Sequence, residues 1–433
     1  MQTSLLAIAK KAQEKKDLRF FNLYRLIDET LLLDCWRDIR KKAAYGVDGI
    51  SAREYGENLI VNIRNLVDRL KKKTYRARLI RRRWLPKPDG RQRPLGIPVV
   101  EDKLLQLAVT RILVAIYEQD FLRCSYGYRP GKGALDAVDK LTVKLQFGRY
   151  NFVVEADIQG FFDNLDQDIL VEMLGRRIGD RQLLRLIGKW LKPGVLDTDG
   201  TVTHPLTGTP QGGIVSPILA NVYLHYALDL WFHDMVKWHT KGEACLIRYA
   251  DDFVCGFENP DEAQQFYGVL EHRLEKFGLQ LAAAKSRVIP FSRNGGPGTT
   301  RFDFLGFEFS WGKDRAGNSH VKRRTSRKKL RNSLANFTQW CRQSRHVPLR
   351  ELFPLLKLKL WGYYNYYGVA GNSGGLKEFF NEAMGTLWKW VNRRSQRRSF
   401  TRQGFEDLLD HFQVPRPRIK VRPCGPTRTA PAS

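Results

Sequence analysis

Long apolar runs and paired cysteines are both missing from this chain. No hydrophobic segment approaches the roughly 20 residues that a membrane-spanning helix needs, and residues 1–17 form a charged amphipathic stretch unlike a signal peptide. The six cysteines are scattered without a Cys-x-x-Cys pair, which argues against a zinc site or a disulfide framework and favours a reducing compartment. We therefore expect a cytoplasmic protein without a membrane partner.

Acidic residues are scarce relative to basic ones. There are 45 Asp and Glu against 73 Lys and Arg, a formal net charge of +28. Residues 311–433 hold 26 Lys and Arg but 7 Asp and Glu, so +19 lies there and +9 in the first 310 residues. Phosphates bound by Lys and Arg release condensed counterions, which makes nucleic acid the expected partner. An anionic membrane is the rival, but no basic amphipathic segment has membrane character.

Length and composition predict two or three domains with packed cores. The chain has 433 residues, of which 42% are hydrophobic and 12% aromatic. Residues 1–80 read as helices, and residues 81–98 as strands around Pro88-Asp89-Gly90. A helix follows, because apolar residues recur at helical spacing at Leu104, Leu105, Ala108, Ile112 and Ile116.

The middle of the chain predicts a ferredoxin-like sheet. Apart from an insertion at 180–240, its elements follow the order β-α-β-β-α-β. In that arrangement the first and third strands are antiparallel central neighbours, so Asp157 at the end of the first meets Asp251 and Asp252 at the start of the third. The four predicted strands are 152–157, 244–248, 253–257 and 286–290.

Carboxylates that converge at one sheet edge suit two-metal phosphoryl transfer. Two Mg²⁺ ions about 3.5–4 Å apart need shared, hard oxygen ligands. Asp157 and Asp251 are the expected bridging ligands, with Asp252 assisting, and Mn²⁺ is a possible substitute. Taken singly, Asp157 could cap a strand and Asp251-Asp252 could form a plain turn. Taken together in this topology, they favour the metal site.

Seven segments resemble, in order, the sequence blocks of group II intron-encoded reverse transcriptases, and the resemblance covers roughly residues 20–400. It implies an α+β right-hand polymerase, with helical and β fingers behind an N-terminal extension (1–150), a ferredoxin-like palm (151–310), an α-helical thumb or maturase region (311–400) and a basic tail (401–433). The segments are Leu85–Pro98, Ser125–Gly133, Ala156–Asp163, Pro210–Pro217, Tyr249–Asp252, Phe302–Phe307 and Trp361–Tyr367.

The resemblance also implies roles for individual residues. Surface charge is the plain alternative for the basic nucleotide-binding positions, core packing for the aromatic one, and a helix-leading turn for the glycines. The implied metal ligands are Asp157, Ile158, Asp251 and Asp252, and the implied nucleotide-binding residues are Lys87, Arg93, Phe162 and Gln211. The implied primer or template contacts are Tyr249, Gly212, Gly213 and Lys285. The predicted RNA contacts are Lys322, Arg323, Arg324, Arg327, Lys328 and Lys329.

The implied activity is RNA-directed DNA synthesis with a maturase role in intron splicing and mobility. The expected partners are an RNA template, an intron RNA, a DNA primer or target and deoxynucleoside triphosphates, in a bacterial cytoplasm near the nucleoid; the oligomeric state stays open. Many family members append a zinc-supported nuclease domain, and without its cysteine and histidine pairs we expect no endonuclease activity. The rivals are a domesticated relative in DNA repair or phage defence, a splicing factor with a vestigial polymerase site, and an RNA-dependent RNA polymerase, which Phe162 disfavours.

Overall fold

The computed structural model describes residues 3–86, 92–204, 207–208, 212–293, 300–314, 316–393 and 400–420. The chain forms two compact units. The first comprises residues 1–133, 154–255 and 261–287, and the second comprises residues 134–153, 256–260 and 288–433. These units cut across the predicted boundaries, so the division into fingers, palm and thumb stays a prediction. Within the described residues, none of the helices combines the length and hydropathy that crossing a bilayer requires.

The first unit begins with helices, as predicted for residues 1–80. Polar caps define two of their starts: Asp28 accepts a hydrogen bond from the backbone N–H of Leu31 at 2.7 Å, and Ser51 forms a reciprocal capping box with Glu54. Such caps satisfy N–H groups that have no partner inside the helix. The helices are α1 (Thr3–Glu14), η1 (Leu23–Leu26), α2 (Glu29–Asp38), α3 (Ala52–Glu57) and α4 (Leu59–Lys71).

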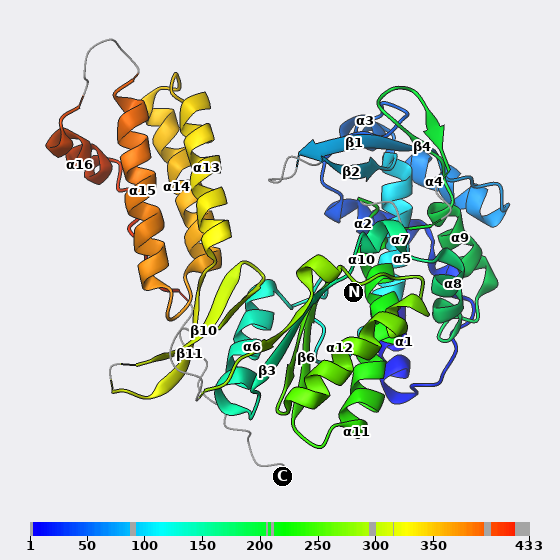
Figure 1. The fold of residues 1–433 in the computed structure, drawn as a ribbon. Coiled ribbons are helices and arrows are strands. Elements are labelled where there is room, and N and C mark those ends of the chain that lie inside the picture. The colour runs from blue at the N-terminus through cyan, green and yellow to red at the C-terminus, as the bar shows by residue number, and fades with distance from the viewer. Residues whose placement is uncertain are drawn as a thin grey trace. The chain divides into compact units, whose positions relative to one another are not determined.

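A small sheet and a long buried helix follow. The strands β1 (Ile80–Pro86), β2 (Gln92–Ile97), β4 (Val195–Leu196) and β5 (Val202–Thr203) pair in the order β2-β1-β4-β5. Helix α5 (Val100–Tyr117) crosses the unit (Figure 1). The apolar residues that predicted this helix are all fully buried, which confirms the periodicity: Leu104, Leu105, Ala108, Ile112 and Ile116.

The predicted ferredoxin-like sheet is present. Its strands β3 (Phe152–Asp157), β6 (Ala244–Tyr249), β7 (Asp252–Phe257) and β8 (Arg287–Pro290) lie in the order β6-β7-β3-β8. The first and third strands in the chain, β3 and β7, are therefore neighbours, as the sequence predicted. The helices of this region are α7 (Phe161–Asn164), α8 (Gln167–Gly175), α9 (Arg181–Leu191), α10 (Ser216–Leu224), α12 (Pro260–Glu275) and η4 (Ala283–Lys285).

The helix that begins at Ser216 changes register along its length. Helix α10 continues into two π-helical turns, η2 (His225–Asp229) and η3 (Phe232–Val236), before α11 (Lys237–His239). Continued at a regular helical spacing, the buried face of Ile218 and Val222 would include Tyr226 and Leu230, but both are half-buried. The wider π turn shifts the register, so Asp229 points inward and is completely buried. A uniform helical period could not predict this change.

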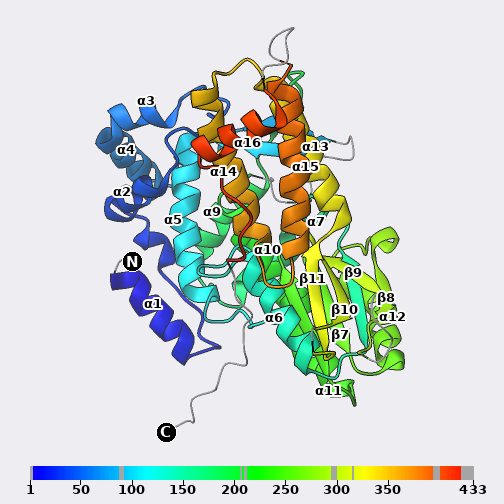
Figure 2. The same ribbon diagram turned by 90° about the vertical axis from the view of Figure 1, so that its left-hand side faces the viewer.

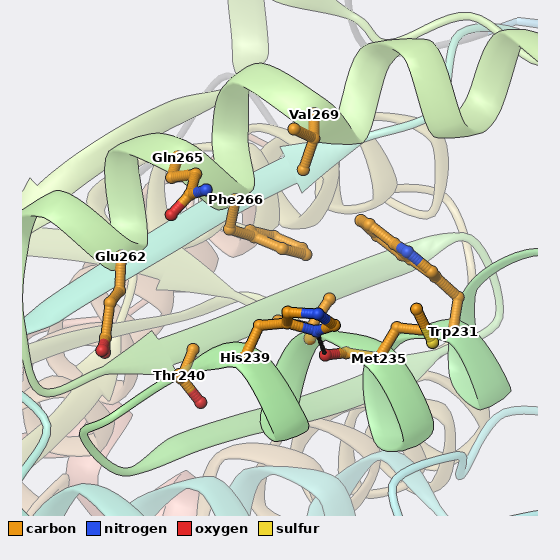
Figure 3. A pocket seen from close by; sticks show the side chains of 9 residues that line it. Trp231, Met235, His239, Thr240, Glu262, Gln265, Phe266 and Val269 are labelled. Carbon is orange, nitrogen blue, oxygen red and sulfur yellow. Dashed lines mark hydrogen bonds between the residues drawn. The ribbon is translucent and has the colours of Figure 1, made fainter.

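A pocket of about 290 Å³ lies between η3 and α12 (Figure 3). Its apolar end holds Trp231, whose ring stacks on Phe266 with the centroids 5.6 Å apart. Thr240 and Glu262 lie at its other end. None of the residues predicted for catalysis lines this pocket.

The second unit pairs a three-stranded sheet with helices. Strands β9 (Arg301–Phe304), β10 (Phe307–Lys313) and β11 (Ser319–Thr325) lie in the order β11-β10-β9. Three long helices lie side by side (Figures 1 and 2), within the stretch 311–400 that was predicted to be α-helical. The helices of this unit are α6 (Ala134–Phe147), α13 (Arg327–Gln343), α14 (Leu349–Tyr367), α15 (Ser373–Val391) and α16 (Arg402–His411).

Candidate active site

Three aspartates come from two neighbouring strands. Asp157 is the last residue of β3, Asp251 lies in the turn between β6 and β7, and Asp252 begins β7. Burial raises the pKa of Asp251, and the negative charge of Asp157 raises it further. A like charge acts in this way only at short range, so the two carboxylates are close. The strand order thus brings Asp157 and Asp251 together.

Lys285 also reaches this edge of the sheet. Its Nζ lies 2.5 Å from Oδ2 of Asp157. The backbone holds this contact in place, since the N–H of Ala282 donates to the Asp157 carbonyl at 2.8 Å and the N–H of Asp157 donates to Ser286 Oγ at 3.3 Å. Lys285, expected to touch the primer strand, therefore lies directly beside the first aspartate.

The turn that carries Asp251 has an unusual backbone. Ala250 adopts a left-handed conformation with φ of 56°, which is strained for a residue with a Cβ atom. Behind it, Gly127 approaches so closely that a Cβ there would lie 2.3 Å from the Ala250 nitrogen. The predicted segment Ser125–Gly133, to which the sequence assigned no role, thus supports the turn.

A buried arginine fastens this turn to the core. Arg248 is completely buried and donates five hydrogen bonds, so all of its N–H groups have acceptors. Its Nη1 reaches the Ala250 carbonyl at 3.0 Å, and its Nε and Nη2 bind the two Asp229 oxygens at 2.7 and 2.5 Å. The two remaining acceptors are Asn221 Oδ1 at 3.0 Å and Ser125 Oγ at 2.8 Å.

Asn221 links this arginine to the glycine behind the turn. Its Nδ2 donates to the Gly127 carbonyl at 2.7 Å while its Oδ1 accepts from Arg248. Arg248, Asp229 and Asn221 were not among the site residues predicted from the sequence. The available signal was Arg248 itself, a charged residue within an otherwise apolar predicted strand.

Arg93 reaches the aspartates from β2. Burial raises the pKa of both Asp251 and Tyr128, and the positive charge of Arg93 opposes this rise at both groups, so the guanidinium lies near them. The ring of Tyr128 lies beside that of Tyr249, with the centroids 6.5 Å apart. A cation predicted to hold a triphosphate is therefore close to an aspartate predicted to hold metal. Lys87, the other such cation, lies outside the described residues.

Phe162 lies on the short helix α7, five residues after Asp157. Its side chain is 8% exposed, and its ring meets the edge of Phe161 with the centroids 5.3 Å apart. The left-handed Gly160, with φ of 54°, turns the chain from β3 into α7. Phe162 is thus fixed by core packing close in sequence to the first aspartate.

The first glycine of the pair ahead of α10 has a steric reason. Gly212 has φ of 114°, and a Cβ there would lie 2.4 Å from the Gly96 carbonyl oxygen. Gly213 is buried, and the next backbone N–H, that of Ile214, donates to Oε1 of the buried Gln106 at 2.9 Å. The segment therefore packs closely against β2. Gln211, predicted to contact the nucleotide, lies outside the described residues.

Five of the six basic residues predicted to bind RNA lie at the surface. Lys322 is partly exposed, and Arg324, Arg327, Lys328 and Lys329 are exposed. Three of them occupy the first turn of α13, where the helix dipole disfavours cations. Helix stability therefore does not explain their position, whereas an anionic partner does.

The prediction that Arg323, the sixth of these residues, contacts RNA is wrong. Its side chain is 4% exposed and pairs with Asp139 of α6. Alternate residues of a β-strand point to opposite faces, so the run Lys322-Arg323-Arg324 cannot present all three side chains to one partner. Arg323 is an internal ion-pair partner in this structure.

The fit of a divalent cation rests on the aspartate pair. Within the described part of the chain, no group of three or more His, Cys, Asp or Glu side chains stands close enough to hold a metal by itself. Asp157 and Asp251 are nevertheless close enough to repel one another. Hard carboxylate oxygens are the ligands that Mg²⁺ prefers, and a cation between two such groups would relieve their repulsion. Ile158 could add only its backbone carbonyl.

A ferredoxin-like sheet that carries paired aspartates at one edge, with a basic side chain reaching in from a second sheet, is the palm of a right-hand polymerase. Comparison with known families agrees, because the model of "Reverse transcriptase (RNA-dependent DNA polymerase)" matches residues 85–309. The chain belongs to this family. It is an RNA-directed DNA polymerase, as the motifs predicted.

The relatives point to group II introns. The chain is 32% identical to Protein YkfC of Escherichia coli (strain K12), over 76% of this chain and 94% of YkfC. It is 37% identical to the group II intron-encoded protein LtrA of Lactococcus lactis, over 50% of this chain and 36% of LtrA. It is 33% identical to a putative COX1/OXI3 intron 1 protein of Saccharomyces cerevisiae, over 37% of this chain and 19% of that protein. The predicted resemblance to group II intron-encoded reverse transcriptases is thereby confirmed.

Among solved structures, a telomerase from Candida albicans is similar with a TM-score of 0.43 and 14% identity, over 79% of this chain and 64% of that one. The chain spans about a third of the length of LtrA and less of the yeast intron protein.

Proposed function

We propose that Asp157, Asp251 and Asp252 hold two Mg²⁺ ions, with the Ile158 carbonyl as a further ligand. When bound, these ions would lower the pKa of the primer 3′-hydroxyl and neutralise the charge of the leaving pyrophosphate, and Mn²⁺ could replace them. The observation that carries the proposal is the strand order, which puts Asp157 at the end of β3 beside the turn that holds the half-buried Asp251 before β7. The charge of Asp157 raises the pKa of Asp251, and bound cations would relieve this repulsion beyond what Lys285 and Arg93 supply.

We propose that Arg93 and Lys87 bind the incoming triphosphate. The position of Arg93 near Asp251 supports this, because the phosphates must lie next to the metal ligands. In the same scheme the ring of Phe162 lies under the sugar and excludes a 2′-hydroxyl, and Gln211 contacts the nucleotide. Core packing of Phe162 would fix the ring for this role, since a mobile ring could not exclude one additional oxygen.

The primer and template are assigned to the same sheet edge. Tyr249 precedes the turn, and Gly212 and Gly213 offer backbone without side chains, which allows a nucleic-acid strand to approach closely. Lys285 supplies a positive charge beside Asp157. We propose that this cation contacts a phosphate of the primer strand near its 3′ end.

The exposed cations at the start of α13 are proposed to bind RNA. Lys322, Arg324, Arg327, Lys328 and Lys329 offer a face that suits a phosphate backbone, in the part of the chain with most of the excess charge. The names of LtrA and the yeast intron proteins support an intron RNA as one ligand and a maturase role in splicing. A bacterial cytoplasm near the nucleoid, with deoxynucleotides and target DNA at hand, is the proposed setting.

Primer extension tests the metal site. The Asp251→Asn, Asp252→Asn variant should lose cDNA synthesis while its affinity for RNA stays within a few-fold of wild type. Asp261→Asn, which removes an exposed carboxylate in the first turn of α12, is the matched control. Polymerisation by the double variant at the wild-type rate would show that the metal assignment is wrong.

A further inference from the structure

Helix α9 carries a row of cations that the polymerase site does not use. Arg181, Arg185 and Lys189 of α9, and Lys192 at its C-cap, are exposed and lie four, four and three residues apart, at the same side of the helix. A rise of 1.5 Å per residue places neighbouring residues of the row about 4.5–6 Å apart along the helix axis and spreads the row over about 17 Å. The opposite side of α9 is buried, which fixes the direction in which the row points.

Two grooves flank this row. A groove of about 640 Å³ separates α9 from α8, and all four cations line it. A second groove of about 210 Å³ is lined by Arg185 and Lys189 and by Lys73, so it adds another cation. Helices α8 and α9 lie next to one another (Figure 1). The row is therefore a ridge between two basic depressions.

The four cations of the ridge have no acidic partner in the described part of the chain. Lys189 donates a hydrogen bond to the Tyr75 carbonyl at 2.6 Å, and its Nζ lies 5.6 Å from the centroid of the Tyr75 ring, but neither contact supplies a negative charge. Asp168 is the acidic lining residue of the larger groove, on its α8 wall. Like charges at this spacing destabilise a helix, so the ridge costs stability without an anionic partner.

A glycine within the ridge is a second, independent indication that a ligand binds to this side of α9. Gly188 lies in the interior of α9 and lines the larger groove. A Cβ at this position would meet nothing within 4 Å. Neither the backbone conformation nor the packing of this protein thus requires glycine here, although glycine weakens a helix. Close approach of a ligand to the helix surface gives the missing reason.

We infer that the α9 ridge binds the sugar-phosphate backbone of a nucleic acid, outside the polymerase site. Its cations pair with successive phosphates, and Gly188 lets the backbone approach the helix between them. This surface is distinct from the first turn of α13 and from the aspartates. It does not depend on the proposed metal site, so failure of the Asp251 and Asp252 test would leave it standing.

The charge of the ridge is tested by salt dependence. The probes are a single-stranded RNA, an RNA duplex and a DNA duplex of the same sequence, with affinity measured between about 50 and 200 mM salt. The variant Arg181→Gln, Arg185→Gln, Lys192→Gln should reduce the slope of log affinity against log salt by about 2 to 3, since each lost phosphate contact contributes about 0.7–0.9. Lys189 is kept because it also binds the Tyr75 backbone.

The control removes the same charge from cations that already have partners. Lys10→Gln, Arg64→Gln, Lys72→Gln takes away three exposed cations that pair with Glu14, Glu29 and Asp68. It should change the slope by much less than the ridge variant. An equal change in both variants would refute the ridge, because net charge alone would then explain the loss. A loss for the RNA probes only would identify RNA as the ligand, and an equal loss for DNA would identify the phosphate backbone shared by both.

Gly188→Ala separates binding from folding. Alanine should raise the melting temperature, since it favours the helix and meets no neighbour. It should also weaken binding of the RNA duplex without altering the salt slope, because no charge is removed. Unchanged affinity in this variant would refute the close approach. Displacement of the RNA by polyglutamate as effectively as by unlabelled RNA, at equal charge, would refute recognition of a phosphate backbone.

Discussion

Arg248 should control the position of the catalytic turn. The substitution Arg248→Lys keeps the charge but reduces the donors from five to three, so at least two of the acceptors around it lose a partner. Each buried acceptor left without a donor costs about 1–3 kcal/mol. The free energy of unfolding should therefore fall by at least about 2 kcal/mol, a loss that a domain with about 5–15 kcal/mol survives.

The effect on activity should exceed the effect on stability. The Ala250 carbonyl would lose its hold on the core, and the strained backbone of Ala250 would relax and carry Asp251 with it. A displacement of about 1 Å in a reacting group can reduce the rate by about a hundredfold. We expect kcat for primer extension to fall by about ten- to a hundredfold, and the Mg²⁺ concentration at half-maximal rate to rise.

Arg177→Lys is the matched control. Arg177 is also buried, in the same unit, and binds Asp120 and backbone carbonyls of the N-terminal segment. This variant should lose comparable stability, measured by urea unfolding, while kcat and the Mg²⁺ midpoint stay at their wild-type values. If both variants lose stability alike and Arg248→Lys also keeps the wild-type kcat and Mg²⁺ midpoint, then Arg248 only stabilises the fold and our reasoning is refuted.

Three further outcomes follow from particular contacts. Phe162→Ala should increase ribonucleotide incorporation in primer extension, and an unchanged ratio would remove the assignment of Phe162 as a sugar gate. Gly212→Ala should lower stability to urea by about 1–3 kcal/mol, because its φ of 114° and the nearby Gly96 carbonyl leave no room for a Cβ; Gly385→Ala, which meets no neighbour, should not. Burial raises the pKa of Asp102 from 3.8 to about 6, so between these values the folded state binds more protons at this carboxyl than the unfolded state. The free energy of unfolding should therefore fall as the pH rises from about 4 to about 6. Asp102→Asn should abolish this contribution to the slope.

The ordering of the palm follows directly from the sequence. Alternating apolar runs, a carboxylate at the end of the first strand and a turn before the third strand specify which elements form and in which order. The β-α-β-β-α-β order then has few compact solutions, and the observed strand order β6-β7-β3-β8 is the expected one. For this reason the meeting of Asp157 with Asp251 could be predicted, although many residues separate them.

The contacts behind the aspartates could not be predicted in the same way. Arg248, Asp229 and Asn221 come from a strand, a π-helical turn and a helix, and their hydrogen bonds depend on how these elements pack. The register shift that buries Asp229 breaks the helical period on which a sequence prediction relies. Arg323 shows the same limit, since only the position of Asp139 turned a surface cation into a buried one.

By itself, the sequence determined the strand and helix order, the aspartates at one sheet edge and the preference for nucleic acid, because these follow from local periodicity, short motifs and net charge. Tertiary structure decided which cations remain exposed, how the turn is held and where the α9 ridge points. Those properties depend on side chains from distant segments that compete for the same partners, and no local pattern encodes the outcome of that competition.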